Sequence, residues 1–178
     1  LYLFCGKHLL AAKLRASNSD PAGGAKTELQ RIIKQIRARW PQVKIIVRGD
    51  SAYSREEIMA WCESEVGIDY VFGLAQNSRL LQLIQSAVGR ASQEYLQKLQ
   101  PVTSFLETLL TPSEELKKQA SALVKNSVWY CSFDYQTTDS WSRSRRVVSK
   151  IEYSCEEVKT RFVVTSLSTK KVPPGRLY

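Results

Sequence analysis

The segment from residue 43 to residue 75 constrains the fold of this chain more than any other part of it. Residues 43–47 (VKIIV) form a short apolar run that fits a buried strand, and residues 69–75 (DYVFGLA) fit a second strand. Between them, Ser54 and Glu57 have the spacing of a capping box, which predicts that a helix begins there. A strand–helix–strand unit implies parallel pairing with a right-handed crossover, so we expect an α/β fold.

Further strands and a helix are predicted before this unit. Residues 1–5 and 9–15 indicate two strands, and Gly6-Lys7 between them fits a tight hairpin turn. The next apolar residues have helical spacing and predict one buried stripe that ends at Pro41: Leu29, Ile32, Ile33, Ile36 and Trp40.

The part of the chain after residue 77 changes from helix to strand. Residues 78–100 predict one or two helices with Gly89 as a break, and Thr111-Pro112-Ser113-Glu114 is a second capping box whose helix runs to about Lys125. Three strands are predicted after it, at residues 127–137, 144–154 and 160–167. The chain therefore predicts a mixed α/β sheet with an insertion. It has no GxGxxG or Walker A loop to indicate a nucleotide-binding fold.

Composition excludes several classes of protein. Hydrophobic residues make up 43% of the chain, an ordinary globular share, and no apolar run approaches the roughly 20 residues that span a bilayer. The four cysteines form no CxxC pair, which argues against a zinc site and favours reduced thiols in a cytosolic protein. No signal peptide is visible, and neither end resembles a natural terminus, so we expect an internal fragment of a longer protein.

The net charge of +9 is unevenly distributed. Residues 1–52 hold 10 basic and 3 acidic side chains, a net of +7, and residues 117–150 hold 7 and 2, a net of +5. Between them, residues 53–116 hold 4 and 9, a net of −5. A polyanionic partner such as nucleic acid would explain two basic blocks, although basic surfaces also serve only to stay solvated.

Asp50 is the candidate catalytic residue. It follows the predicted strand 43–47 and stands beside Gly49, and a carboxylate at the carboxyl end of such a strand is well placed to hold a divalent metal. The alternative is a turn aspartate that binds its own backbone. One carboxylate does not make a catalytic site.

A second candidate site lies between two predicted strands. A tryptophan in a basic turn can stack on an extruded base, and arginines can bind phosphates with their planar forks. The alternative is a core tryptophan beside a solvated run of charge. The residues that we expect to contact DNA are Trp141, Arg143, Arg145 and Arg146.

Several blocks of the chain resemble a known family, in that family's order. The segment around Gly49-Asp50-Ser51 resembles the second-aspartate region of bacterial IS1380-group transposases, within the broad IS4-like DDE class. The other resembling blocks are residues 1–20, 69–77, 139–143 and 161–167. The similarity covers nearly the whole chain.

The resemblance implies an RNase H-like mixed sheet with helices, plus an inserted helical and β-rich segment. Residues 1–77 would form part of the catalytic core, residues 78–155 the insertion, and residues 156–178 a return strand that stops before the glutamate helix. The family's first aspartate would precede Leu1. Of the three catalytic carboxylates, only Asp50 falls within this chain, so we expect the fragment itself to be inactive.

The resemblance also implies an activity and its partners. Three carboxylates would hold two Mg²⁺ or Mn²⁺ ions for DNA cleavage and strand transfer at insertion-sequence ends. Arg48 would point away from Asp50 toward the DNA backbone. The partner would be double-stranded DNA in the bacterial cytoplasm at the nucleoid, with no membrane, and a homodimer on that DNA stays open. The alternatives are a non-catalytic DNA-binding domain, a degenerate transposase remnant and a structure-specific nuclease.

Overall fold

The computed structural model describes residues 1–14, 16, 18–109, 112–122 and 124–178. The chain forms two compact units, which we describe separately. Unit 1 comprises Leu1–Leu74, Tyr135–Arg145 and Val164–Leu167, and unit 2 comprises Ala75–Asp134, Arg146–Val163 and Ser168–Tyr178. The first boundary between the two units lies after Leu74, and the sequence-based division placed its first boundary after residue 77. The predicted division into catalytic core, insertion and return strand stays a prediction.

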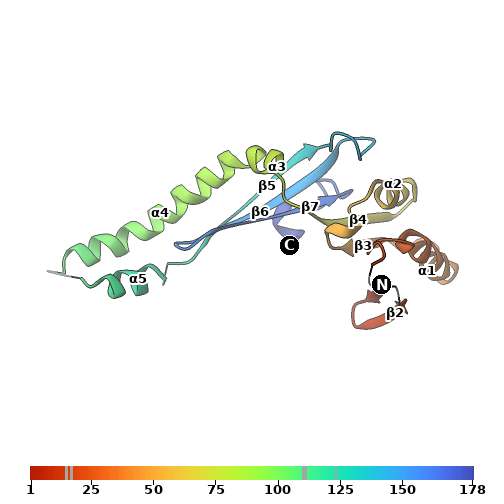
Figure 1. Cartoon of the computed structure of the whole chain (residues 1–178), viewed down its shortest axis with the longest axis horizontal. Helices are drawn as coiled ribbons and strands as arrows, with labels where there is room; N and C mark the ends of the chain where they lie inside the picture. Colours follow the sequence, from red (N-terminus) through yellow and green to blue (C-terminus); the bar gives the residue numbers. More distant parts are fainter. Residues whose placement is uncertain (15, 17, 110–111, 123) are drawn as a thin grey trace. The chain divides into compact units, whose positions relative to one another are not determined.

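Unit 1 begins with the predicted hairpin. Strands β1 (Tyr2–Cys5) and β2 (His8–Ala12) pair antiparallel and form a two-stranded sheet of their own (Figure 1). Gly6 in the turn has a φ of 58°, a left-handed conformation that glycine adopts without strain. The hairpin prediction is confirmed, with a second strand shorter than expected.

Helix α1 (Ala25–Arg39) buries Leu29, Ile32 and Ile33 as its apolar spacing predicts. The prediction that Trp40 belongs to this buried stripe is wrong, because its side chain is 62% exposed. The helix ends at Arg39, and Trp40 has φ −131° and ψ 80°, so its side chain departs from the helical face.

The predicted strand–helix–strand unit is confirmed. Strand β3 (Ile45–Gly49) pairs parallel with β4 (Ile68–Leu74), and a short 3-10 turn, η1 (Ser51–Tyr53), and helix α2 (Glu56–Ser64) connect them. The register places Gly49 opposite Phe72. The buried side chains of this unit include Ile58, Met59, Cys62, Tyr70 and Phe72, and they form much of the core of unit 1.

The capping box predicted at the start of α2 is wrong. The helix begins one residue after Arg55, and no side chain caps it. The Ser54 hydroxyl instead donates to the carbonyl of Ser51 at 2.8 Å. Ser54 thus closes the 3-10 turn, and this local bond competes with the capping role that the spacing suggested.

Unit 2 contains two adjoining helices, α3 (Ser78–Leu83) and α4 (Gln85–Glu107), and a shorter helix, α5 (Glu114–Ala122), beside the end of α4 (Figure 1). The helices break at Ile84 and not at Gly89, which lies inside α4. At α5, the Ser113 hydroxyl accepts from the Leu116 amide at 3.2 Å. Thr111, the predicted first residue of that capping box, lies outside the described residues.

The predicted strands of the second half are observed as β5 (Ser127–Tyr135), β6 (Arg145–Tyr153) and β7 (Val158–Thr165). A further 3-10 turn, η2 (Pro174–Arg176), follows them. The strand order is β3-β4-β7-β6-β5, a five-stranded mixed sheet. The end of β7 belongs to unit 1, where the Thr165 hydroxyl donates to the Tyr70 carbonyl at 2.5 Å. The α/β prediction is therefore confirmed at this coarse level.

Candidate active site

Asp50 lies directly after β3, where the chain turns. Its side chain is exposed, and one oxygen, Oδ1, accepts from the Ala52 amide at 2.9 Å. Among the residues that the structure describes, no lysine or arginine forms an ion pair with this carboxylate. The turn interaction that the sequence offered as an alternative is thus present, and the second oxygen of Asp50 takes no part in it.

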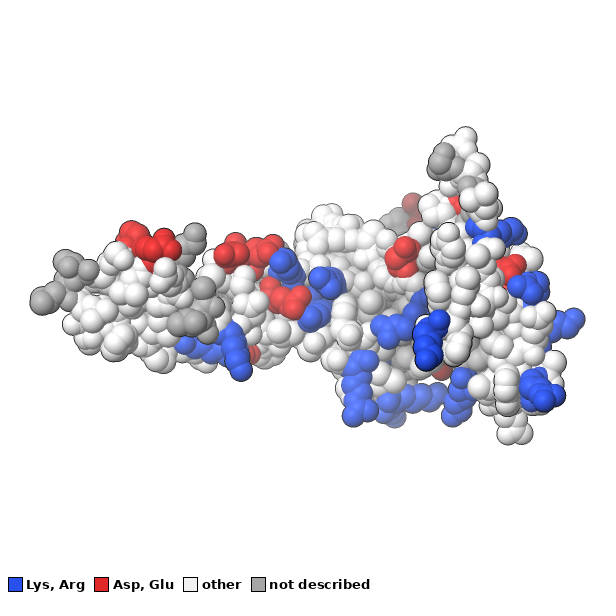
Figure 2. Space-filling view, turned by 90° about the horizontal axis from the view of Figure 1, so that it is seen from below, with Lys and Arg blue, Asp and Glu red and all other residues white. Residues whose placement is uncertain are grey.

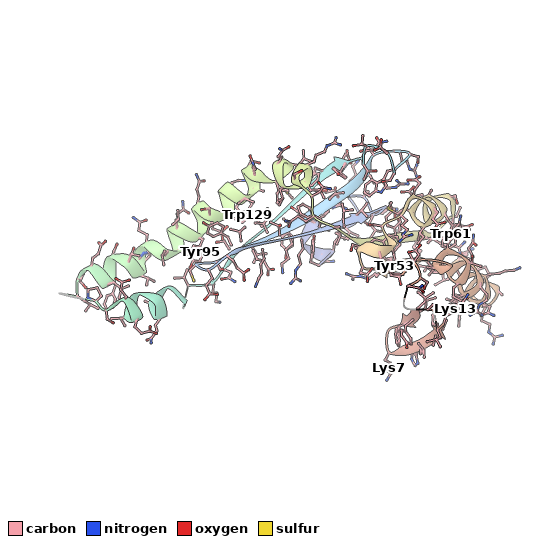
Figure 3. All side chains as sticks on the ribbon, viewed as in Figure 1. Lys7, Lys13, Tyr53, Trp61, Tyr95 and Trp129 are labelled. Atoms are coloured by element: carbon pink, nitrogen blue, oxygen red, sulfur yellow. The ribbon has the colours of Figure 1, made fainter. Side chains whose placement is uncertain are left out.

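Two glycines allow close packing around this turn. A Cβ on Gly49 would lie 2.8 Å from Cδ2 of Tyr53, whose place in unit 1 is labelled in Figure 3. A Cβ on Gly73 in β4 would lie 3.0 Å from the Ser51 amide nitrogen. Only glycine therefore lets the Tyr53 ring and the β4 backbone approach the turn so closely, and both contacts restrict where the turn can lie.

A cavity of 580 Å³ in unit 1 opens beside Asp50. One of the residues that line this cavity is acidic, and it is Asp50. The wall is otherwise largely apolar and includes Leu1, Leu29 and Val47. Arg48 also lines this cavity. The expectation that its side chain points away from Asp50 toward DNA stays a prediction.

The described residues supply one ligand for a divalent cation rather than a complete site. They contain no group of three or more His, Cys, Asp or Glu side chains that could hold a metal ion. Mg²⁺ and Mn²⁺ take several oxygen ligands, so a single carboxylate binds them weakly. An exposed carboxylate without a cationic partner nevertheless fits the role of one such ligand.

The second candidate site has a different character from the one predicted. Trp141 is 6% exposed and packs edge-on against Tyr135, with ring centroids 5.7 Å apart. Arg145 is 4% exposed, and its guanidinium lies 5.6 Å from the centre of the Trp141 ring. In this arrangement both side chains are part of the core of unit 1. The alternative interpretation of the sequence included a core tryptophan, but it expected the neighbouring charges to be solvated, and Arg145 is buried instead.

Two glutamates of α2 hold Arg145 in place. Its guanidinium donates to Glu56 at 2.7 and 3.2 Å and to Glu63 at 2.7 and 3.0 Å. The hydrogen bond from Arg145 is the largest influence on Glu56 and lowers the pKa of that carboxyl to about 2. Burial acts to raise the pKa of Glu63, but hydrogen bonds from Arg145, Arg143 and Tyr70 outweigh it and lower the pKa.

The other two residues of the second candidate site, Arg143 and Arg146, are less buried than Trp141 and Arg145. The Arg143 side chain is 57% exposed, although it forms an ion pair with Glu63. Arg146 belongs to unit 2, where it is half-buried and donates to the Ser132 hydroxyl at 2.9 Å and to the Val172 carbonyl at 3.1 Å. DNA contact by any of the four residues stays a prediction.

The sequence-based predictions did not include the two partners of Arg145, Glu56 and Glu63. Glu56 and Glu63 are seven residues apart, which places them on one face of α2, and this spacing was available as a signal. It does not identify a partner more than 80 positions later in the chain, and only the fold supplies that information.

A carboxylate at the end of a parallel strand can contribute one oxygen ligand to a divalent cation, and the basic blocks of the chain suit a polyanionic partner. The comparison with known families defines the class. The chain matches the family "Transposase DDE domain group 1" over residues 1–178 and belongs to it. No curated protein and no solved structure matched the chain.

Membership of this family carries a function in general terms. It implies a transposase, with a role in DNA transposition and with DNA as a partner. The predicted DDE class is therefore confirmed, while the assignment to the IS1380 group is not shown. No helix among the described residues has both the length and the apolar character needed to cross a membrane.

Proposed function

We propose that this chain is part of the RNase H-like catalytic domain of an IS1380-group transposase, and that Asp50 is one of its metal-binding carboxylates. The observation that carries the proposal is the state of Asp50. It is an exposed carboxylate at the end of a parallel strand, it lines a 580 Å³ cavity, and no cation among the described residues neutralises it. Family membership supplies the reaction class.

The residues of this chain would prepare the site before any DNA is bound. Ala52 orients the Asp50 carboxylate through its amide, and Gly49 and Gly73 let neighbouring groups hold the turn. Bound Mg²⁺ or Mn²⁺ would supply activation of water, or of a DNA 3′-hydroxyl, for attack on a phosphodiester bond. Arg48, in the wall of the same cavity, would contact a phosphate of the cleaved strand.

Arg143 is the other DNA contact that we retain, because its side chain is largely exposed. Contact by Trp141 or Arg145 would require the cluster with Glu56 and Glu63 to open, and we assign these two side chains a structural role. Arg146 would likewise have to leave its partners in unit 2.

The test is the Asp50→Asn variant, assayed for cleavage of duplex DNA carrying the insertion-sequence ends and for binding to the same DNA. Because asparagine removes the charge but keeps the size, we expect the transposase to lose cleavage by at least about a hundredfold while its DNA affinity is kept. The 178 residues alone should not cleave, since Asp50 is the acidic residue among those lining the cavity. Efficient cleavage by the 178 residues, or by the variant, would contradict the proposal.

A second candidate is a non-catalytic DNA-binding domain, and the uneven charge favours it, because two basic blocks suit a polyanionic partner. That candidate predicts salt-dependent duplex binding through the basic blocks. It also predicts that this binding survives Asp50→Asn unchanged. Loss of cleavage in the variant with unchanged binding distinguishes the two candidates.

A further inference from the structure

Arg55 contacts the same residue that orients the Asp50 carboxylate. Its Nε donates to the carbonyl of Ala52 at 2.9 Å, and the amide of Ala52 donates to Asp50 Oδ1 at 2.9 Å. A single residue of the turn is therefore held at its carbonyl by Arg55 and holds Asp50 with its amide. Movement of Ala52 would release the carboxylate, so the position of Asp50 depends on this short chain of contacts.

Arg55 is itself fixed by an aspartate that precedes α1. Its two terminal nitrogens donate to the two carboxylate oxygens of Asp20, at 2.5 and 2.6 Å. This is the two-pronged geometry that arginine forms with a carboxylate and that lysine cannot form. Asp20 Oδ1 also accepts from the amide of Ala22 at 3.0 Å, so the loop before α1 is connected to the turn after β3.

The ion pair between Arg55 and Asp20 affects the charge near Asp50. An arginine five residues after a metal-binding aspartate could neutralise it, and a neutralised carboxylate attracts cations poorly. The carboxylate of Asp20 occupies both terminal nitrogens of Arg55, and Nε is used for the Ala52 carbonyl. Arg55 thus supports the turn without forming an ion pair with Asp50.

We propose that Arg55 is the positioning residue of the Asp50 carboxylate and that Asp20 anchors it. The proposal rests on the proposed function in one respect, that Asp50 binds a divalent cation. The Arg55 and Asp20 side chains are 41% and 45% exposed, so their ion pair contributes little to the stability of the fold. Its effect is on position. With Oδ1 engaged by Ala52, the carboxylate keeps one orientation and presents Oδ2 to a cation.

Hydrogen exchange of the Ala52 amide tests the positioning directly, because that amide makes the bond to Asp50. In the Arg55→Ala and Arg55→Lys variants of the whole chain, we expect this amide to exchange about two- to fivefold faster. This is the change in rate that corresponds to losing the free energy of an exposed ion pair. Asp20→Ala should have a similar effect, and Asp50→Ala a larger one. Arg39→Ala, a change at an exposed arginine of α1, is the control and should leave the rate unchanged.

Broadening of backbone amide signals by Mn²⁺ alone tests the consequence for the metal. In the unaltered chain, Mn²⁺ should broaden the signals of residues 49–53 selectively. Asp50→Asn should remove this effect, and Arg55→Lys should require several times more Mn²⁺ for the same broadening, while Arg39→Ala should match the unaltered chain.

The two measurements separate failure of this proposal from failure of the proposed function. If Arg55→Ala and Arg55→Lys leave both the Ala52 exchange rate and the Mn²⁺ titration unchanged while Asp50→Asn abolishes broadening, Arg55 is not a positioning residue and the metal role of Asp50 stands. If Asp50→Asn leaves the broadening unchanged, the metal role is wrong. The exchange rate of Ala52 then still decides whether Arg55 holds the turn.

Discussion

Replacing Arg145 by methionine should destabilise unit 1 more than the same replacement of its neighbour Arg143. The Arg145 side chain is 2% exposed and makes four hydrogen bonds to two carboxylates. Methionine has a similar volume without the charge. Removing one partner of a buried ion pair costs about 3–5 kcal/mol, because the other charge is left without compensation.

The structure reduces this figure. Glu63 would be left 11% exposed, but it keeps the hydrogen bond from the Tyr70 hydroxyl at 2.7 Å and the ion pair with Arg143. Glu56, at 30% exposure, keeps the bond from Ser142 and reaches water. We therefore expect a loss of about 2–4 kcal/mol in the free energy of unfolding, which lowers the melting temperature of a chain of this size by roughly 5–15 °C.

Urea denaturation followed by tryptophan fluorescence and circular dichroism measures the change. Arg143→Met is the matched control, because Arg143 also pairs with Glu63 but is 57% exposed, and it should cost less than about 1 kcal/mol. Combining Arg145→Met with Glu56→Gln and Glu63→Gln should recover part of the loss, since no buried charge then lacks a partner. Equal losses for the two single variants would refute the reasoning.

Three further outcomes follow from the same structure. The pKa of Glu56 is lowered to about 2 from an ordinary 4.5, so the ionised carboxylate contributes fully to stability above pH 4.5 and loses that contribution as the pH falls toward 2. Acid titration of the unaltered chain should therefore show a loss of stability between pH 4.5 and 2. This loss should be smaller in Arg145→Met, which lacks the partner that lowers the pKa. Gly73→Ala should cost about 1–3 kcal/mol of unfolding free energy, because its Cβ would lie 3.0 Å from the Ser51 nitrogen. Gly89→Ala in α4, where nothing lies within 4 Å of the new Cβ, should instead stabilise the fold by about 0.5–1 kcal/mol. Equal effects of the two changes in denaturation would contradict this reasoning. Trp61→Ala, at 9% exposure, should cost about 3–5 kcal/mol, and Trp40→Ala, at 62%, less than about 1 kcal/mol, so a large loss for Trp40→Ala would mean that this side chain is covered.

Local patterns were sufficient to predict most of the helices and strands. The apolar runs at 43–47 and 69–75 indicated β3 and β4, and their parallel pairing followed from the helix between them. The hairpin followed from Gly6, whose positive φ the structure shows. These features depend on residues close together in sequence, and sequence periodicity reports them directly.

The errors at element ends have local causes as well. Trp40 has helical spacing with Ile33 and Ile36, but the helix stops one residue before it. Ser54 has the spacing of a cap, but its hydroxyl closes the preceding turn. Spacing alone does not decide between two local hydrogen bonds of similar strength, and element ends are therefore the least certain part of a sequence-based assignment.

The candidate site was predictable in part. Asp50 was found because strand ends and glycines mark such positions, and its bond to Ala52 corresponds to the alternative of a turn aspartate. The burial of Arg145 was not predictable, because it depends on Glu56 and Glu63, which lie on a helix far away in sequence. A run of arginines looks the same in sequence whether its partners are phosphates or carboxylates.

The central claim is that the Asp50 carboxylate binds the divalent cation used for DNA cleavage, and a change of metal preference tests it most directly. In the transposase, Asp50→Cys replaces an oxygen ligand by sulfur, which binds Mn²⁺ better than Mg²⁺. The account predicts that this variant loses cleavage of insertion-sequence ends in Mg²⁺ and recovers a measurable part of it in Mn²⁺. Cleavage by Asp50→Cys in Mg²⁺ at the rate of the unaltered enzyme would contradict it.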